Sequence, residues 1–490
     1  MKARQLEKLG IPHQLTKMVK WLIPRARATG MSADEVRKLL AKIVADPDAH
    51  RDDPHFGEVA QQLARMDLAG DRRQAGWRER DAPAPWKEWT GPNIELDPQS
   101  VRQLHNACGL PVTLAGALMP DAHVGYGLPI GGVLATDNAV IPYAVGVDIA
   151  CRMKLTVLDL EPKALESQPD RLIRAIEDET RFGIGAQFRD RRREHPVMDA
   201  DWNRTPMIRH LKDKAHAQLG TSGSGNHFVE FGEFTVDDAQ ARALNVPGAA
   251  SLPGALPGAG TYLALLSHSG SRGTGATIAD HYSRLAMDLH PELPAELRHL
   301  AWLDLGSAEG QEYWAAMSLM GEYAAANHAL IHRHIAKHLG ARVMLDIENH
   351  HNFAWKETHT IAGEQREAIV HRKGATPAGL NVLGIIPGSM ASPCYIVRGR
   401  GNDEALQSAS HGAGRVMSRT KAKQTYRWSD ARPLLEKRHV TLLSAGLDEL
   451  PFVYKNIDDV IAAQSDLVDI AGRFDPRIVK MAPAGERPED

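Results

Sequence analysis

Residues 139–160 read AVIPYAVGVDIACRMKLTVLDL, in which two short apolar runs flank a segment with a glycine, an aspartate and a cysteine. Short apolar runs bounded by glycine or proline are typical of strands, so we predict strands at 139–150 and 153–160. Asp148 and Cys151 are three residues apart, and a straight strand would point their side chains to opposite faces. A ligand shared by both residues therefore requires a turn or bulge here.

Short apolar runs separated by glycine and proline recur through the chain from about residue 95 onward. Further strands are predicted at GGVLAT (131–136), TYLALLSH (261–268), ARVMLDI (341–347) and LNVLGIIPG (380–388), and helices at 160–180, 275–290, 308–338 and 455–472. Strands and helices do not alternate regularly, which favours an α+β fold. We expect one large domain of mixed sheets with surrounding helices, at residues 95–490.

The N-terminal part has a different pattern. Residues 1–70 are predicted to form a small helical accessory segment, in which Ser32 and Glu35 make a capping box at the start of one helix. A second helical pattern covers residues 58–66. Residues 71–94 are charged, contain prolines and lack periodicity, which indicates a linker or strap.

Composition limits the class of protein. The 490 residues are 43% apolar, and 58 Lys and Arg balance 61 Asp and Glu, so any site for a polyanion must be a local patch. Three distant cysteines argue against a disulfide framework and for a reducing compartment. No apolar run approaches the length of a membrane span, and the basic N-terminus lacks a secretory core. We expect a cytoplasmic protein.

Polar residues suited to metal binding recur where predicted strands meet glycine-rich loops. His227 ends the loop GTSGSGN and precedes Glu230, His268 precedes a glycine-rich turn with Arg272, and the sequence IENHHN offers His350 and His351. Together with Asp148 and Cys151, three of these histidines would hold two divalent ions if the thiolate bridges them. Cysteine with histidine favours zinc, whereas the carboxylate also admits manganese, so the residue types leave the metal open.

A second histidine cluster has a simpler interpretation. The sequence NHALIHRHIAKH places His328 with His332, and His334 with His338, four residues apart. This spacing can chelate a metal, but the two pairs lie on different helix faces and no acidic residue is nearby. We therefore interpret the segment as an ordinary amphipathic helix.

His411 is the candidate nucleophile. The sequence contains neither a P-loop nor the K-x-D-G motif of lysine-based nucleotidyl transferases, but small-residue loops at 220–226, 385–390 and 411–414 suit phosphate binding. Glycines beside His411 allow a phosphate to approach closely, and a neutral imidazole can attack phosphorus. Arg415, Arg419 and Lys423 follow at intervals of four, which predicts a cationic stripe on one helix face, with a solvated charged face as the alternative.

Eight stretches, in this order, resemble the RtcB family of RNA ligases over residues 95–480. They are MPDAHVGYGLPIGGVLAT, VGVDIAC, GSGNHFVE, HSGSRG, HHN, VHRKGAT, IPGSM and SHGAGRVMSR. The resemblance implies a GTP-dependent ligase that joins an RNA 3′-phosphate or 2′,3′-cyclic phosphate to a 5′-hydroxyl, in tRNA splicing or RNA repair. It also implies that His411 is guanylylated.

The resemblance assigns further roles residue by residue. Two manganese ions are expected at Asp148, Cys151, His227, His268 and His351, with the thiolate shared. GTP is expected at Asn226, His227, Phe228, Val229, Glu230, His351, Asn352, Pro387, Gly388, Ser389, Met390, His411, Gly412, Ala413, Gly414 and Lys480. RNA or its phosphates are expected at Arg272, Arg415, Arg419 and Lys423. Two positions depart from the family pattern: Arg152 replaces a usual glycine, and Cys394 replaces a serine that often contacts the nucleotide.

Two other classes of protein would use the same residues. A dinuclear metal phosphohydrolase would need the metal ligands without a covalent nucleotide, and an RNA-end binding protein would bind without joining. Only the ligase predicts a covalent, acid-labile protein–GMP adduct. The natural RNA, an activating partner, the oligomeric state and the role of the N-terminal helices are open from sequence.

Overall fold

A computed structural model describes residues 1–189, 192–245 and 255–485. The chain divides into two compact units: a small unit of Met1–Arg78 with Leu285–Arg298, and a large unit of Glu79–Arg284 with His299–Asp490. The division at Arg78 lies within residues 71–94, the predicted linker. Among the described residues, no helix has the length and apolar character needed to cross a membrane.

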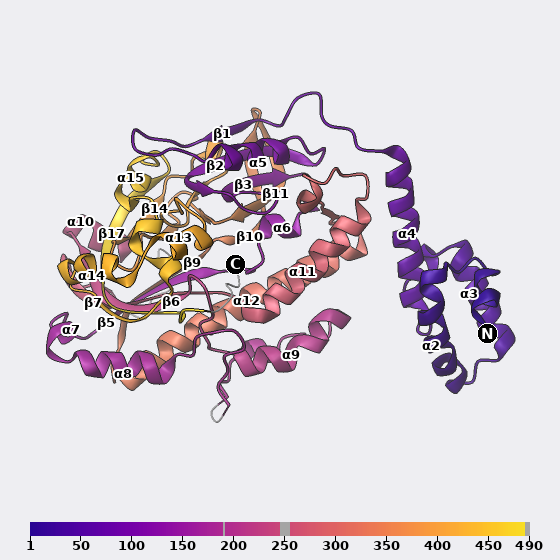
Figure 1. Ribbon diagram of the computed structural model, residues 1–490, viewed down its shortest axis with the longest axis horizontal. Helices are drawn as coiled ribbons and strands as arrows, with labels where there is room; N and C mark the ends of the chain where they lie inside the picture. Colours follow the sequence, from indigo (N-terminus) through magenta and orange to yellow (C-terminus); the bar gives the residue numbers. More distant parts are fainter. Residues whose placement is uncertain (190–191, 246–254, 486–490) are drawn as a thin grey trace. The chain divides into compact units, whose positions relative to one another are not determined.

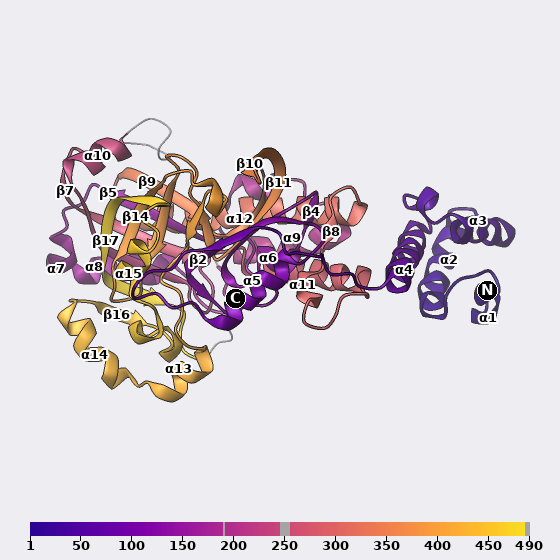
Figure 2. The same cartoon turned by 90° about the horizontal axis from the view of Figure 1, so that it is seen from above.

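The small unit is helical and has its own core. Ser32 accepts a hydrogen bond from the Glu35 amide and Glu35 bonds back to the Ser32 amide, which confirms the predicted capping box. Apolar residues from every helix, among them Leu6, Val19 and Leu40, pack together. Its helices are α1 (Ala3–Glu7), α2 (Thr16–Ala28), α3 (Ala33–Ala45) and α4 (Gly57–Ala75) (Figure 2).

The large unit is built on an eight-stranded sheet in the order β13-β14-β17-β6-β7-β5-β9, with β16 paired in parallel to β17 and all other pairs antiparallel. The sheet curls so that its two edge strands, β13 and β9, meet. At this point the Ile385 amide of β13 donates to Asn349 Oδ1 of β9 at 3.0 Å. Its strands are β5 (Arg152–Leu158), β6 (Phe228–Val236), β7 (Gly260–Ser269), β9 (Val343–His350), β13 (Leu383–Pro387), β14 (Cys394–Gly399), β16 (Thr441–Ser444) and β17 (Val468–Met481).

A second sheet has five strands in the order β1-β2-β3-β11-β10 (Figure 1). Its strands are β1 (Trp86–Glu88), β2 (Thr113–His123), β3 (Ile130–Thr136), β10 (Asn352–Ile361) and β11 (Glu364–Lys373). Two further ribbons pair β4 (Ala139–Val140) with β8 (Leu303–Asp304), and β12 (Ala375–Pro377) with β15 (Ser408–Ser410).

Helices cover the large sheet. Alternating side chains of β7 face opposite sides: Leu263 and Leu265 pack against helices α8 and α12, while Ala264 and Leu266 fill the inside of the curl. The remaining helices are α5 (Pro98–Cys108), α6 (Pro142–Val145), α7 (Ala164–Ser167), α8 (Pro169–Glu179), α9 (Pro206–Gln218), α10 (Asp238–Leu244), α11 (Arg272–Leu289), α12 (Ala308–His338), α13 (Arg419–Thr425), α14 (Trp428–Lys437) and α15 (Ile457–Ala462). The α+β prediction is confirmed.

Two element predictions are wrong. Residues 139–150 do not form one strand: β4 ends at Val140 and Pro142 begins α6, because proline suits the first turn of a helix. The predicted helix 455–472 ends at Ala462, and β17 begins at Val468.

Candidate active site

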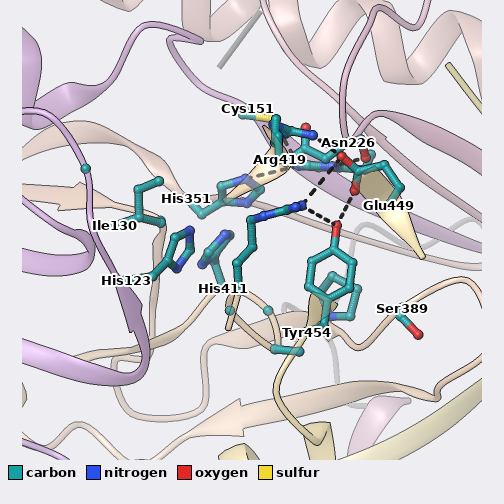
Figure 3. A pocket seen from close by; sticks show the side chains of 18 of the residues that line it. His123, Ile130, Cys151, Asn226, His351, Ser389, His411, Arg419, Glu449 and Tyr454 are labelled. Carbon is teal, nitrogen blue, oxygen red and sulfur yellow. Dashed lines mark hydrogen bonds and ion pairs between the residues drawn. The ribbon is translucent and has the colours of Figure 1, made fainter. Parts of the chain in front are cut away.

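A pocket of about 640 Å³ opens where the ends of the two sheets meet (Figure 3). In the large sheet, the starts of β5 and β6 lie beside the ends of β7 and β9, since these pairs are antiparallel and in register. Residues that adjoin these strand ends therefore converge, although they are far apart in sequence. The candidate metal ligands are such residues: Cys151, His227, His268 and His351.

Asp148, Cys151 and His227 form the first of two groups with ligand atoms close enough to share an ion. His227 Nε2 lies 3.0 Å from Asp148 Oδ2 and 3.5 Å from Cys151 Sγ. The chain turns at Ala150, whose φ is 58°, and the Cys151 amide donates to the Asp148 carbonyl at 3.2 Å. The predicted turn is confirmed, and it brings Asp148 and Cys151 to the same side.

Cys151, His268 and His351 form the second group, so the cysteine belongs to both. His268 Nε2 lies 3.0 Å from Cys151 Sγ and 3.2 Å from His351 Nε2. His268 Nδ1 donates to the Asn226 carbonyl at 3.1 Å, and His227 Nδ1 donates to the Ser222 carbonyl at 2.8 Å. These bonds leave both Nε2 atoms as ligands, so the donor set fits two divalent ions around one thiolate.

Burial and neighbouring groups keep three of these ligands in the protonation states that metals bind. Burial lowers the pKa of His268 to about 3 and the pKa of His351 well below the ordinary value. Burial alone would raise the pKa of Asp148, but hydrogen bonding and charge interaction with His227 outweigh it and the net pKa is lowered. The two groups thus include two neutral imidazoles, those of His268 and His351, and the ionised carboxylate of Asp148.

The glycines in the neighbouring loops give the site its space. A Cβ on Gly270 would lie 2.2 Å from both oxygens of Asp148, which is impossible without displacing the carboxylate. A Cβ on Gly414, whose φ is 73°, would lie 2.0 Å from the Asp121 carbonyl oxygen. Glycine is therefore required for the close approach of the 411–414 loop to β2.

His411 follows β15 and faces the second metal group. Its ring centroid lies 5.0 Å from that of His351. His411 Nδ1 lies 2.7 Å from Oδ2 of Asp121, a fully buried residue near the end of β2. The same oxygen accepts from the amides of His411 and Gly412 at 3.1 and 3.3 Å.

Asp121 fixes the tautomer of His411. Burial would raise the pKa of Asp121, but the hydrogen bond from His411 and nearby positive charge, including that of Lys455, outweigh it, so the pKa is lowered and the carboxylate is ionised. An ionised carboxylate only accepts, so Nδ1 is the donor, and in the neutral ring Nε2 then keeps its lone pair. The ring is thereby prepared as a nucleophile.

Most residues expected to hold a nucleotide line the pocket, and three do not: His227, Val229 and Lys480. The lining residues are Asn226, Phe228, Glu230, His351, Asn352, Pro387, Gly388, Ser389, Met390, His411, Gly412, Ala413 and Gly414. Val229 points to the opposite face of β6, into the core below α8 and α12. Along β17 successive side chains point to opposite faces, and Val479 and Met481, on either side of Lys480, line the pocket. The Lys480 ammonium lies on the other face, over the Phe182 ring. The expected nucleotide contacts of Val229 and Lys480 are therefore not reflected in the pocket lining and stay predictions.

Arg272, expected to contact RNA, is only 1% exposed. Its Nε donates to Thr221 Oγ1 at 3.1 Å and its Nη2 to the Gly183 carbonyl at 3.4 Å. Arg272 therefore supports the glycine-rich loop that precedes His227, and the predicted RNA contact is corrected to this role.

The predicted cationic stripe is not a single helix face. Ser418 caps α13, so the helix begins at Arg419 and Arg415 lies in the preceding loop. All three cations face a pair of buried acids: Arg415 is 3.8 Å from Glu449, Arg419 contacts Glu449 and is 3.2 Å from Asp448, and Lys423 is 3.4 Å from Asp448. Arg415 and Arg419 still line the pocket.

The second histidine cluster lies on α12. His328 and His332 are buried and hydrogen-bond to Ser267 Oγ at 2.8 and 2.7 Å, which makes them part of the core. His334 and His338 lie 3.7 and 3.4 Å from Glu179, so the expectation that no acidic residue is nearby is wrong. Among the described residues, neither pair belongs to a three-ligand group.

Individual sequence positions do not indicate Asp121, which bonds His411, or the pocket residues His123, Lys373, Glu449 and Tyr454. Burial lowers the pKa of His123 to about 4 and that of Lys373 to about 7. The only indication of Asp121 and His123 in the sequence is the stretch MPDAHVGYG, which contributes to the family resemblance.

The two departures from the family pattern differ in position. The Arg152 guanidinium lies 3.3 Å from Glu348 and donates to the Gly321 carbonyl, so it does not enter the pocket. Cys394 is buried and lines the pocket, and burial raises the pKa of its thiol.

Comparison with known proteins agrees with this geometry. The family model described as "tRNA-splicing ligase RtcB" matches residues 103–206 and 194–481. The chain is 35% identical over 418 residues to the RNA-splicing ligase RtcB of Escherichia coli K12, covering 79% of this chain and 95% of that protein. It is 33% identical to the RNA-splicing ligase RtcB of Mycobacterium tuberculosis (76% and 98% covered) and 30% identical to the tRNA-splicing ligase RtcB of Archaeoglobus fulgidus (80% and 91% covered).

The fold and site define a protein with two candidate metal-ligand groups that share one cysteine, beside a histidine held by a buried carboxylate. The chain belongs to the RtcB family of tRNA-splicing ligases.

Proposed function

We propose that the protein is an RNA ligase that uses GTP to join an RNA 3′-phosphate, or a 2′,3′-cyclic phosphate, to a 5′-hydroxyl in tRNA splicing or RNA repair. The observation that carries this proposal is His411, held by buried Asp121 at 2.7 Å and facing a metal-ligand group that contains His351. Family membership supports RNA as the substrate.

His411 Nε2 attacks the α-phosphorus of GTP, forming a P–N bond as the P–O bond to the β-phosphate breaks and pyrophosphate leaves. The proton stays on Nδ1, and the Asp121 carboxylate stabilises the positive ring. An oxygen of the RNA 3′-phosphate then takes the GMP, which frees His411. The 5′-hydroxyl oxygen then attacks the phosphorus of the activated 3′-phosphate and loses its proton to solvent, while the P–O bond to GMP breaks and GMP leaves. A cyclic phosphate is first opened by water to the 3′-phosphate.

Two manganese ions, bound by the groups that share Cys151, would withdraw charge from the reacting phosphates. The loops around Asn226 and Gly388 and the side chains of Phe228 and Glu230 hold the guanosine nucleotide. Arg415 and Arg419 line the same pocket and contact RNA phosphates, with Lys423 alongside them.

The proposal is tested with one RNA that ends in a 3′-phosphate and a second that begins with a 5′-hydroxyl, incubated with protein, GTP and Mn²⁺. The expected result is a joined RNA, formed only when GTP is present, with release of GMP and pyrophosphate. A 3′-phosphate removed without joining would identify a phosphohydrolase. RNA that is bound but unchanged would identify an end-binding protein, and either result overturns the proposal.

A further inference from the structure

Helix α2 of the small unit has two unlike faces. Val19, Leu22, Ile23 and Ala26 point into the core of that unit. The opposite face, which we call the α2 basic face, consists of exposed residues at helical spacing: Lys17, Lys20, Trp21 and Arg25.

Trp21 is 55% exposed, although tryptophan is among the side chains that gain most from burial. The Arg25 guanidinium lies over the ring, 3.4 Å from its centroid. An exposed indole with a cation on it is a flat surface on which a nucleobase can stack.

The charge around Trp21 is of one sign. Between Glu7 and Asp34 the sequence has no acidic residue and five basic ones, Lys8, Lys17, Lys20, Arg25 and Arg27. Within the part of the chain that the structure describes, Lys17 and Lys20 form no salt bridge, unlike Arg419 and Lys423 on α13. The chain as a whole has a net charge of −3, so this is a local positive patch.

We propose that the α2 basic face binds single-stranded RNA, with a base on Trp21 and phosphates on Lys17 and Lys20. The choice of RNA as the polyanion rests on the proposed function. The face lies outside the residues matched by the family model, which begin at 103, so it is a binding surface added to the ligase body.

The test measures binding of an unstructured RNA of about 30 nucleotides by the full-length protein, at several salt concentrations, because such surfaces cover roughly 4–16 nucleotides. Trp21→Ala is expected to weaken binding about tenfold, the effect of losing one stacked base. Lys17→Gln/Lys20→Gln should flatten the slope of log affinity against log salt by about 1.4.

The matched control is Lys38→Gln/Lys42→Gln, which removes the same charge from the exposed side of α3, beside Asp34 and Glu35. It should leave both quantities close to those of the unmodified protein. Equal effects of the two lysine pairs, unchanged binding by Trp21→Ala, or no RNA binding by the unmodified protein would each overturn the proposal.

Two further assays test the proposed function separately from this inference. They measure formation of the protein–GMP adduct from GTP and joining of RNAs that are only a few nucleotides long. Both activities should be the same in all these variants. A further outcome is that the unmodified protein never accepts GMP while Trp21→Ala still weakens RNA binding. That result would support the proposal for the α2 basic face and reject the ligase chemistry.

Discussion

Asp121 and His411 are 290 residues apart in the chain, yet they form the contact on which the proposed chemistry depends. Asp121→Asn keeps the shape of the side chain but removes the negative charge that fixes the tautomer and stabilises the positive ring. We expect protein–GMP formation to slow about 100-fold, a typical effect of losing one group that assists proton positioning.

Time courses of label transfer from GTP measure this directly. Asp137→Asn, at an exposed position, is the matched control and should label at the normal rate. Labelling of Asp121→Asn at the normal rate would mean that Asp121 does not prepare the nucleophile.

Cys151 is the only residue common to both metal-ligand groups among the described residues. Cys151→Ser should therefore reduce manganese binding at both groups, whereas His227→Ala should affect mainly the group with Asp148. Metal content by mass spectrometry after equilibration with Mn²⁺ reports this without any assay of activity. Cys108→Ser, a buried cysteine outside both groups, is the control. Full metal content in Cys151→Ser would contradict a shared thiolate.

The candidate metal ligands could be predicted because they lie at or near strand ends, several of them beside glycine-rich loops, and strand ends of an antiparallel sheet meet. Asp121 was not, because its function depends on a partner supplied by a different sheet. Lys480 and Arg272 lie outside the expected positions for a related reason. The direction of a strand residue and the burial of an arginine depend on neighbours that sequence position does not reveal.

At the level of elements, long periodic segments were predicted well. The helix expected at 308–338 has those bounds, and 275–290 corresponds to α11. The errors at 139–150 and 455–472 fall where a short apolar run is compatible with either strand or helix.

The ion pairs of α13 predict unequal effects on stability. Arg419 contacts buried Asp448 and Glu449, so Arg419→Ala leaves two acids with less compensation and should lower the free energy of unfolding by about 1–3 kcal/mol. The Lys423 side chain is 44% exposed, and Lys423→Ala should lower it by less than about 1 kcal/mol. Denaturant titration of the two variants measures the difference. Equal decreases in the free energy of unfolding would indicate that these ion pairs behave as surface contacts and contribute little to stability.

At the level of the whole molecule, the sequence predicted an α+β body with a helical N-terminal segment, and the structure brings His411 and the five candidate metal ligands close together. What the sequence could not predict is how two sheets meet at a common edge, since that depends on the curl of the large sheet and the pairing of β12 with β15.

The central claim is that His411 carries GMP, and His411→Ala tests it most directly. The protein is incubated with Mn²⁺ and GTP labelled at the α-phosphate, and the denatured chain is analysed for bound label. The unmodified protein should carry acid-labile label and His411→Ala none, while His411→Ala should still join an RNA that already has a GMP-activated 3′-phosphate to a 5′-hydroxyl. Label retained by His411→Ala, or absent from the unmodified protein, would contradict the claim.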